Sequence, residues 1–298
     1  MKYSAHVPHR SIIGFDLGGT KSAIARYDED TWEIEAQERL PTHADRGFSH
    51  VLKDVLMIIE RLRVPETRAI GIGVPGLVRQ PDGVLLRAPN IPHSEHVPLK
   101  ETLEEALKLP VFVDNDANCF ALAEALSGAG KGHRIVVGIT MGTGVGGGIV
   151  IDGNIFHGEH GYAAELGHML LQPGHPPYRT SDQRGDAEQF LSGTALRKRC
   201  EEAKRPEDYL EGEVCAFLHE EIFREAAWLC ANLTHVLDPG IIVFGGSTGR
   251  ALKPHLSAVQ RELKEWLLPE TPLPPLTVST LSDAATLGAA LLAHTYAT

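Results

Sequence analysis

Four polar residues crowd one helix start in this 298-residue chain. Asp114, Asn115, Asp116 and Asn118 follow an apolar run and open a predicted helix through Leu126. One Asn or Asp at such a junction only caps the helix. Capping explains four polar residues less well. A carboxylate held in a cleft can accept the proton of a hydroxyl group as a general base, and this segment is a candidate for that chemistry.

A second candidate pairs a carboxylate with an imidazole. Glu165 and His168 lie three residues apart, on one helical face if the segment is helical. Such a pair can bind two hydroxyls of a polyol. The alternative is a surface ion pair, or a histidine with no role among the 15 in the chain. Glu188, just before Phe190, is a further candidate.

Glycines dominate the third candidate segment. The β-branched run 135–140 predicts a buried strand, and the apolar run 149–151 predicts another, closed by an Asp-Gly turn. Glycine lets backbone N–H groups converge on a phosphate. A literal G-x-G-x-x-G occurs here, but a strand follows it, which excludes a Rossmann site. A plain glycine-rich hairpin is the alternative. The glycines are Gly142, Gly144, Gly146, Gly147 and Gly148.

Two more strand-to-glycine turns support phosphate binding. At the first, Gly18 and Gly19 would admit a phosphate, Thr20 and Lys21 would donate to it, and Asp16 would face Mg²⁺ through water. An ordinary hairpin with a surface lysine is the alternative. The other turn is 245–246, both glycines, after a predicted strand. Three such turns are what the cleft of an actin-like ATPase needs, two for the phosphates and one for the nucleoside.

Hydrophobic periodicity predicts the elements that position these residues. Strands and helices alternate, which indicates an α/β fold. Strands are expected at 11–17, 20–27, 32–39, 69–74, 110–113, 241–244 and 276–279, and helices at 47–63, 99–109, 213–237, 251–268 and 284–294.

Composition excludes some functions. The formal net charge is −11 and 43% of residues are hydrophobic. An acidic chain is a poor binder of nucleic acid or anionic membrane, and no apolar run approaches the length of a membrane span. The four cysteines are far apart and form no C-x-x-C pair. We therefore expect no disulfide framework, no thiolate zinc site and a reduced, cytoplasmic compartment.

Taken together, these motifs resemble the ROK group of bacterial sugar kinases, repressors and open reading frames. The resemblance covers nearly the whole chain and implies an actin-like, hexokinase-type (ribonuclease H-like) fold, with two α/β domains around a central cleft. The small domain would comprise 1–117 plus 285–298, and the large domain 118–284. The matching motifs are Asp16-Leu-Gly-Gly-Thr-Lys21, Gly71-Ile-Gly-Val-Pro-Gly76, Ala88-Pro-Asn90, Asn115-Asp-Ala-Asn-Cys119, Gly142-Thr-Gly-Val-Gly-Gly-Gly148, Gly161-Tyr-Ala-Ala-Glu-Leu-Gly-His168, Glu188, Leu191-Ser-Gly193, Asp238-Pro239, Gly245-Gly246 and Gly288-Ala-Ala290.

The resemblance also implies roles for individual residues. Asp116 would be the general base on the sugar hydroxyl. The residues expected to contact the sugar are Gly76, Asn90, Asn115, Asp116, Glu165, His168 and Glu188. The residues expected to contact the nucleotide are Asp16, Gly18, Gly19, Thr20, Lys21, Gly142, Thr143, Gly144, Gly245 and Gly246.

Two features depart from the family pattern. Family members usually hold zinc with the histidine matching His168 and three cysteines. Here the cysteine positions carry Arg179, Ser181 and Asp186, so no structural zinc is expected. An ion pair of Arg179 or Arg184 with Asp182 or Asp186 is a plausible replacement. The tryptophan common after the Pro-Asn element is also absent, and His93-Ser-Glu-His96 stands there.

The expected function is ATP- and Mg²⁺-dependent phosphorylation of a hexose, glucose to glucose 6-phosphate. N-acetylhexosamine, mannose or fructose are alternative substrates, and polyphosphate is an alternative donor. A non-catalytic sugar-sensing module or repressor is the alternative class. About ten residues precede the first strand, too few for a helix-turn-helix. Expected partners are a sugar and ATP, without nucleic acid or membrane, and the chain is expected to form a homodimer.

Overall fold

The computed structural model describes residues 9–204, 206–210 and 212–297, which form two compact units. The first unit contains the chain up to Cys119, residues Gly158–Tyr162 and the chain from Asp283. The second contains Phe120–His157 and Ala163–Ser282. That these units are the two domains expected from the sequence stays a prediction.

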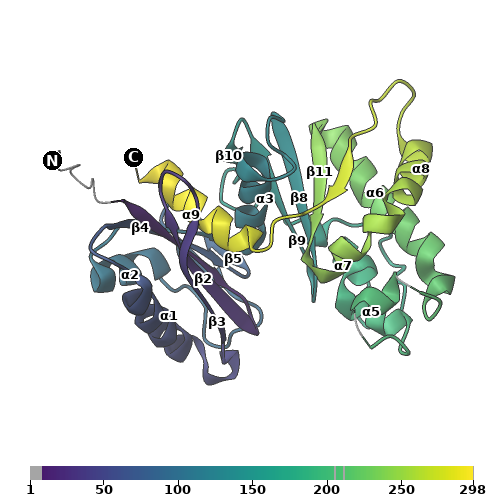
Figure 1. Ribbon diagram of the computed structural model, residues 1–298. Helices are drawn as coiled ribbons and strands as arrows, with labels where there is room; N and C mark the ends of the chain where they lie inside the picture. Colours follow the sequence, from purple (N-terminus) through teal and green to yellow (C-terminus); the bar gives the residue numbers. More distant parts are fainter. Residues whose placement is uncertain (1–8, 205, 211, 298) are drawn as a thin grey trace. The chain divides into compact units, whose positions relative to one another are not determined.

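A five-stranded sheet forms the centre of the first unit, in the order β3-β2-β1-β4-β7 (Figure 1). β1, β2 and β3 are antiparallel neighbours, and β4 and β7 run parallel to β1. Two short strands, β5 and β6, form a separate hairpin. The bounds are β1 Ser11–Leu17, β2 Lys21–Asp28, β3 Ile34–Pro41, β4 Thr67–Val74, β5 Leu77–Arg79, β6 Val84–Arg87 and β7 Val111–Asn115.

Alternation along β1 divides its side chains between two faces of this sheet. Ile13 and Phe15 join the core formed with α1 (Phe48–Leu62) and α2 (Leu99–Leu107). The opposite face, with Ile12, packs against α9 (Ala284–Tyr296). Because side chains alternate along a strand, Asp16 lies on the same face as Ile12.

Glycines bring α9 into backbone contact with that face. A Cβ on Gly14 would lie 2.0 Å from the carbonyl oxygen of Thr286, and one on Gly71 would lie 1.7 Å from that of Ala289. Gly288 of α9 is as tightly packed, because its Cβ would lie 1.7 Å from the carbonyl oxygen of Cys119. Only hydrogen fits at these three positions.

The second unit repeats the strand pattern of the first. Its sheet has the order β10-β9-β8-β11-β12, with antiparallel β8, β9 and β10 and with β11 and β12 parallel to β8. The long helices α6 and α8 pack together beside this sheet, within one core (Figure 1). The bounds are β8 Ile135–Met141, β9 Val145–Ile151, β10 Asn154–Ile155, β11 Ile241–Gly245, β12 Leu276–Val278, α6 His219–Leu237 and α8 Leu256–Trp266.

Shorter helices complete the unit. α3 begins at Asp116 and ends at Ser127, so the boundary between the two units falls within it. The others are α4 Ala187–Leu191, α5 Gly193–Arg199 and α7 Gly246–Ala251, with 3₁₀ turns η2 Leu166–His168, η3 Pro206–Tyr209, η4 Ala216–Leu218 and η5 Lys253–His255. The 3₁₀ turn η1, Ala44–Arg46, belongs to the first unit.

The expectation of no disulfide is wrong. Cys200 and Cys215 are bonded, with an S–S distance of 2.04 Å and their Cα atoms 6.0 Å apart. Cys200 ends α5, and the chain returns to it after 15 residues, so the pair is made by the fold rather than by local spacing. The cysteine pattern therefore gives no support for a reducing compartment. Cys119 and Cys230 are free and buried.

Among the described residues, none of the helices combines the length and apolarity required to cross a bilayer.

We predict that Gly71→Ala lowers the free energy of unfolding by on the order of 1–3 kcal/mol, because the new methyl group has no room beside Ala289. Gly249→Ala is the matched control, since the nearest atom to a Cβ there is 3.5 Å away. Denaturant unfolding of both variants tests this. Equal midpoints would show that α9 can shift to make room.

Candidate active site

The turn after β1 is held by Thr42, which directly follows β3. Thr42 Oγ1 donates to the carbonyl oxygen of Gly18 (2.6 Å), and the N–H of Thr42 donates to that of Thr20 (2.9 Å). A Cβ on Gly18 would lie 2.3 Å from the carbonyl oxygen of Lys21. This contact explains the glycine at the turn. The side chains of Thr20 and Lys21 are exposed.

Two neighbouring carboxylates act electrostatically on Asp16, which lies on the α9 face of the first sheet. Burial, with the charges of Asp116 and Asp283, raises the pKa of Asp16 to about 7. Asp16 comes from β1, Asp116 begins α3 and Asp283 precedes α9, where it pairs with Arg39. Carboxylate oxygens are the ligands that Mg²⁺ prefers, and a divalent cation would relieve their repulsion. The oxygens of Asp16, Asp116 and Asp283 do not all lie within 4.8 Å of one another, so these residues form no compact ligand set, and Mg²⁺ held through water at Asp16 stays an expectation.

Capping accounts for one of the four polar residues at the start of α3, and a side-chain hydrogen bond accounts for another. Asn115 Oδ1 accepts from the N–H groups of Ala117 (2.8 Å) and Asn118 (3.2 Å). Asp114 is buried and accepts from the side-chain amide of Asn118 (2.9 Å). Asp116 is partly buried, and its Oδ1 accepts from the N–H of Ala117 (2.8 Å). Asp114 and Asn115 are thus engaged within the segment, and the role of Asp116 as a base stays a prediction.

Gly76 and Asn90 are placed by tight packing near these groups. The amide of Asn115 donates to the carbonyl oxygen of Gly76 (3.0 Å). Gly76 has φ of +93°, and a Cβ there would lie 2.1 Å from the carbonyl oxygen of Arg87. Asn90 lies beside the β1–β2 turn, since a Cβ on Gly19 would be 3.0 Å from that of Asn90. Asn90 is exposed and available to a ligand.

In the second unit, the glycine hairpin between β8 and β9 is fixed to α5. The N–H of Gly193 donates to the carbonyl oxygen of Gly142 (2.7 Å), and the hydroxyl of Thr194 donates to that of Thr143 (2.8 Å). The turn itself is short. Gly142 to Gly144 form it, while Gly146, Gly147 and Gly148 lie within β9.

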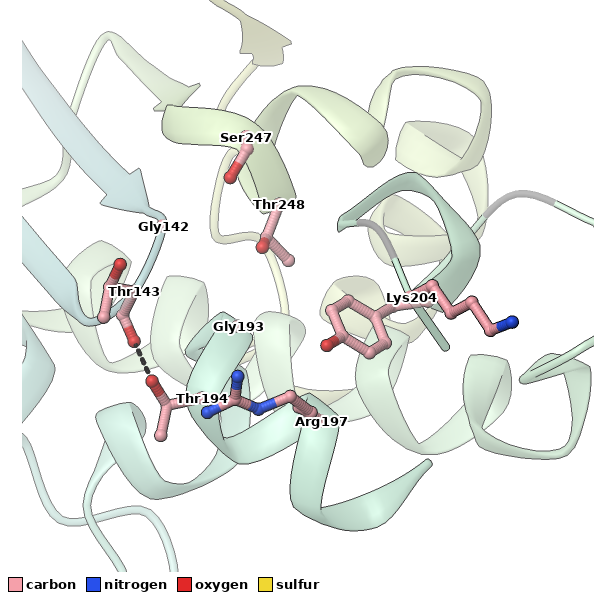
Figure 2. A pocket seen from close by; sticks show the side chains of 9 residues that line it. Gly142, Thr143, Gly193, Thr194, Arg197, Lys204, Ser247 and Thr248 are labelled. Carbon is pink, nitrogen blue, oxygen red and sulfur yellow. Dashed lines mark hydrogen bonds between the residues drawn. The ribbon is translucent and has the colours of Figure 1, made fainter. Parts of the chain in front are cut away.

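A cavity of about 250 Å³ opens beside this hairpin (Figure 2). Its described lining carries the cations Arg197 and Lys204 and no carboxylate, in a chain of net charge −11. The described residues that line it are Gly142, Thr143, Gly193, Thr194, Arg197, Lys204, Tyr209, Ser247 and Thr248.

Thr248 contributes an unsatisfied hydroxyl to the cavity. Its side chain is fully buried and, among the described residues, its Oγ1 has no hydrogen-bond partner. Gly246 allows the chain to turn sharply before it, with φ of +74° and a Cβ position 2.3 Å from the carbonyl oxygen of Met141. Gly245 packs on Phe120. A buried hydroxyl without a partner is costly, so the cavity fits a polar, anionic ligand such as the phosphates of ATP.

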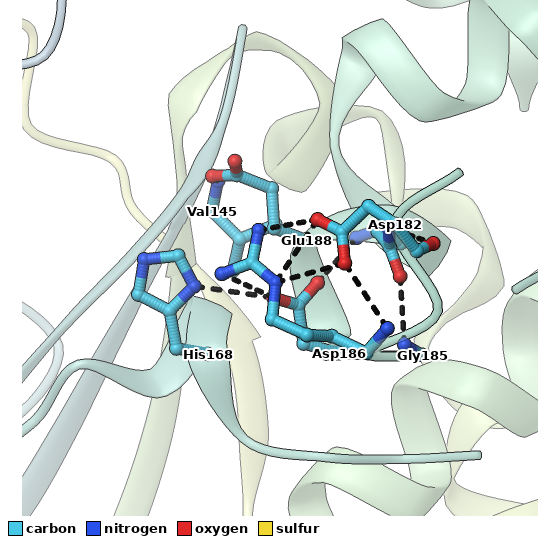
Figure 3. A network of polar contacts seen from close by, with 8 residues as sticks. Val145, His168, Asp182, Gly185, Asp186 and Glu188 are labelled. Carbon is cyan, nitrogen blue, oxygen red and sulfur yellow. Dashed lines mark hydrogen bonds and ion pairs between the residues drawn. The ribbon is translucent and has the colours of Figure 1, made fainter. Parts of the chain in front are cut away.

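His168 and Glu188 act electrostatically on Glu165. Figure 3 shows His168 and Glu188 in one polar network beside Val145. Glu188 Oε2 accepts from the N–H of Val145 (3.0 Å). Burial and the charge of Glu188 raise the pKa of Glu165, while His168 lowers it. The segment of Glu165 is not an α-helix, because only the single 3₁₀ turn η2 follows it.

Polar contacts hold the segment 182–186. Arg184 pairs with Asp182 (2.6 Å) and lies 3.5 Å from Asp186. This confirms the ion pair expected from the sequence for Arg184. His168 Nδ1 lies 3.2 Å from Asp186 Oδ2.

Sequence reasoning missed several residues of these sites. Ser247 and Thr248 directly follow the predicted Gly245-Gly246 turn, so extending that motif by two residues would have found them. Arg197 and Lys204 reach the cavity from a helix and a loop without a local signal. Asp283 stands just before the last helix, where it looks like an ordinary cap.

The chain matches the ROK family over residues 12–296. The glucokinase of Thermotoga maritima is 30% identical over 314 aligned residues, covering 95% of this chain and 97% of that protein. The N-acetyl-D-glucosamine kinase of Salmonella arizonae is 32% identical, covering 95% of this chain and 99% of that protein. The structure of a ROK family glucokinase from Streptomyces griseus, in complex with glucose and AMPPNP, superposes with a TM-score of 0.75 at 29% identity, covering 96% and 99% of the two chains.

The chain therefore belongs to the ROK family. Its fold is the actin-like ATPase fold of the ROK sugar kinases, which confirms the fold expected from the motifs.

The raised pKa of Asp16 makes stability depend on pH. Between the ordinary aspartate value of 3.8 and about 7, folded Asp16 keeps a proton that the unfolded chain has lost, so stability falls as pH rises. We predict that Asp16→Asn removes this contribution and gains on the order of 1–4 kcal/mol over wild type between pH 4 and pH 8. Denaturant unfolding at several pH values measures the difference.

The exposed Asp45 gives the matched control, Asp45→Asn. Its stability curve should run parallel to that of the wild type across this pH range. If the Asp16→Asn curve also runs parallel, Asp16 is ionised in the folded protein and the carboxylates are not crowded.

Proposed function

We propose that the protein is an ATP-dependent hexose kinase that converts glucose to glucose 6-phosphate. The observation that carries this proposal is the placement of Asp116, a partly buried carboxylate at the start of α3 that acts on the pKa of Asp16. Family membership supports the same activity, since the relatives named above are kinases for glucose or N-acetyl-D-glucosamine.

Asp116 would accept the proton of the attacking sugar hydroxyl as its oxygen bonds to the terminal phosphorus of ATP. Asp16 would hold Mg²⁺ through water, and Mg²⁺ would neutralise phosphate charge. Asn90, Asn115 and Gly76 would contribute sugar contacts from the first unit. Asn115 has one amide hydrogen left for this, because the other bonds Gly76.

In the second unit, Glu165, His168 and Glu188 would bind sugar hydroxyls. The phosphates would lie on the hairpin of Gly142, Thr143 and Gly144. Gly245 and Gly246 would place Ser247 and Thr248 against the nucleotide. The cations of the cavity would attract its negative charge. In the first unit, Gly18, Gly19, Thr20 and Lys21 would be the residues that contact phosphate.

N-acetyl-D-glucosamine is the second candidate substrate, because a relative of comparable identity acts on it. ADP release measured over a panel of glucose, N-acetyl-D-glucosamine, mannose and fructose, with ATP or polyphosphate as donor, separates these choices. A sugar that binds by calorimetry without ADP release from any donor would instead indicate a non-catalytic sugar-sensing module.

We predict that Asp116→Asn lowers kcat on the order of 10²–10⁴-fold, because it removes the general base. The asparagine keeps an oxygen to accept from the N–H of Ala117, so folding should be unchanged. Steady-state kinetics and a melting temperature measured on the same preparation test this. Turnover at the wild-type rate would remove Asp116 from this role.

We predict that Thr248→Val raises KM for ATP on the order of 2- to 10-fold, the weight of one hydrogen bond, while KM for the sugar is unchanged. The unliganded variant should melt no lower than wild type, because the lost hydroxyl has no partner among the described residues. Thr194→Val is the matched control and should destabilise the protein, since that hydroxyl bonds Thr143. Unchanged affinity for ATP in Thr248→Val would place the nucleotide elsewhere.

A further inference from the structure

His168 and Asp186 are brought together by backbone pairing of two loop segments. The N–H of Ala187 donates to the carbonyl oxygen of Met169 (2.9 Å), and the N–H of Leu171 donates to that of Gly185 (2.9 Å). Gly185 has φ of +62°, and a Cβ there would lie 1.9 Å from the carbonyl oxygen of Gln172. This pairing fixes the backbone on both sides of the His168–Asp186 contact.

Both carboxylate oxygens of Asp186 have polar partners. Its side chain is 1% exposed, and its Oδ1 caps α4 by accepting from the N–H of Gln189 (3.1 Å). Its Oδ2 lies 3.2 Å from His168 Nδ1 and 3.5 Å from Arg184 (Figure 3). The imidazole itself remains half exposed, at 52%.

This geometry determines which ring nitrogen carries the proton. An ionised carboxylate only accepts hydrogen bonds. A neutral imidazole beside Asp186 must therefore donate from Nδ1, and this leaves Nε2 as an acceptor. Among the described residues, Nε2 has no hydrogen-bond partner of its own.

We propose that Asp186 is a positioning residue that holds His168 in the Nδ1–H form, so that Nε2 accepts a hydrogen bond from a sugar hydroxyl. The contact with sugar rests on the proposed function, whereas the proton position does not. The carboxylate of Glu188 and Nε2 of His168 are then both hydrogen-bond acceptors. A ligand at this position must donate hydrogen bonds, as the hydroxyl groups of a sugar do.

The donor set around His168 favours this role over a metal site. A structural zinc site is normally closed by thiolates. Here Arg179 and Ser181 replace two of them, and the guanidinium of Arg184 lies 3.5 Å from the oxygen that a cation would need. Asp186 would thus orient the imidazole as a carboxylate, in the position where the family usually has a cysteine ligand.

The direct test is the proton position by ¹⁵N NMR of sugar-free protein, with the His168 signals assigned by their loss in His168→Gln. We expect Nδ1 to be protonated in wild type. Asp186→Asn keeps an oxygen to cap α4 and turns an amide toward the ring, so the proton should move to Nε2. Asp182→Asn is the matched control. It breaks the ion pair with Arg184 without touching His168, and it should leave the proton on Nδ1.

Kinetics test the consequence for the sugar. We expect Asp186→Asn to raise KM for the sugar about 10-fold, with KM for ATP and kcat within about 2-fold of wild type. Asp182→Asn should match wild type. A reversed proton position with unchanged KM for the sugar would overturn the proposed hydroxyl contact.

Two further results would overturn the role of Asp186. One is the same proton position in wild type and Asp186→Asn. The other is one zinc per chain in protein purified without added zinc, with His168 signals that shift when EDTA removes it. A wild-type protein inactive on every hexose would refute the kinase, while the NMR result would still decide the proton position.

Discussion

The first unit depends on the contact between the backbone of α9 and two strands of its sheet. Gly14 and Gly71 have no side chain, so the backbone of α9 packs directly against the backbones of β1 and β4. This approach places Asp283, at the start of α9, close enough to Asp16 to act on its pKa. A larger residue at either glycine would move the helix and separate the carboxylates. The packing of α9 on the sheet therefore also determines the electrostatic environment of Asp16.

Charge is divided unevenly between the two units. The first concentrates carboxylates at Asp16, Asp116 and Asp283, while the cavity of the second unit is lined by Arg197 and Lys204. Oxygen-rich anions suit a hard cation, and cations suit a phosphate chain. The net charge of −11 hides this division, so composition says little about an anionic substrate.

Much of the fold could be predicted from the sequence, because its elements are local. The strand at Ser11–Leu17 and the helix at Phe48–Leu62 follow from periodicity, and the glycine turns from residue type. The Cys200–Cys215 bond could not be predicted, since it depends on how the chain returns after α5. The role of each glycine in the run 142–148 could also be predicted only in part. Gly147 lies within β9, where a Cβ would be 2.2 Å from Leu166 Cγ. The packing of Leu166 therefore explains the glycine at this position, and a phosphate is not needed to explain it.

The assignment of α9 to the first unit has a consequence for the order in which the protein is made. Ile12, Ala25, Tyr27 and Ala69 line the sheet face that α9 covers. During synthesis from the N-terminus, this face is complete long before residues 283–297 leave the ribosome. The second unit, whose residues lie between, can close its own sheet first. The first unit therefore matures after the second, and its apolar face stays open to solvent or a chaperone until α9 has left the ribosome.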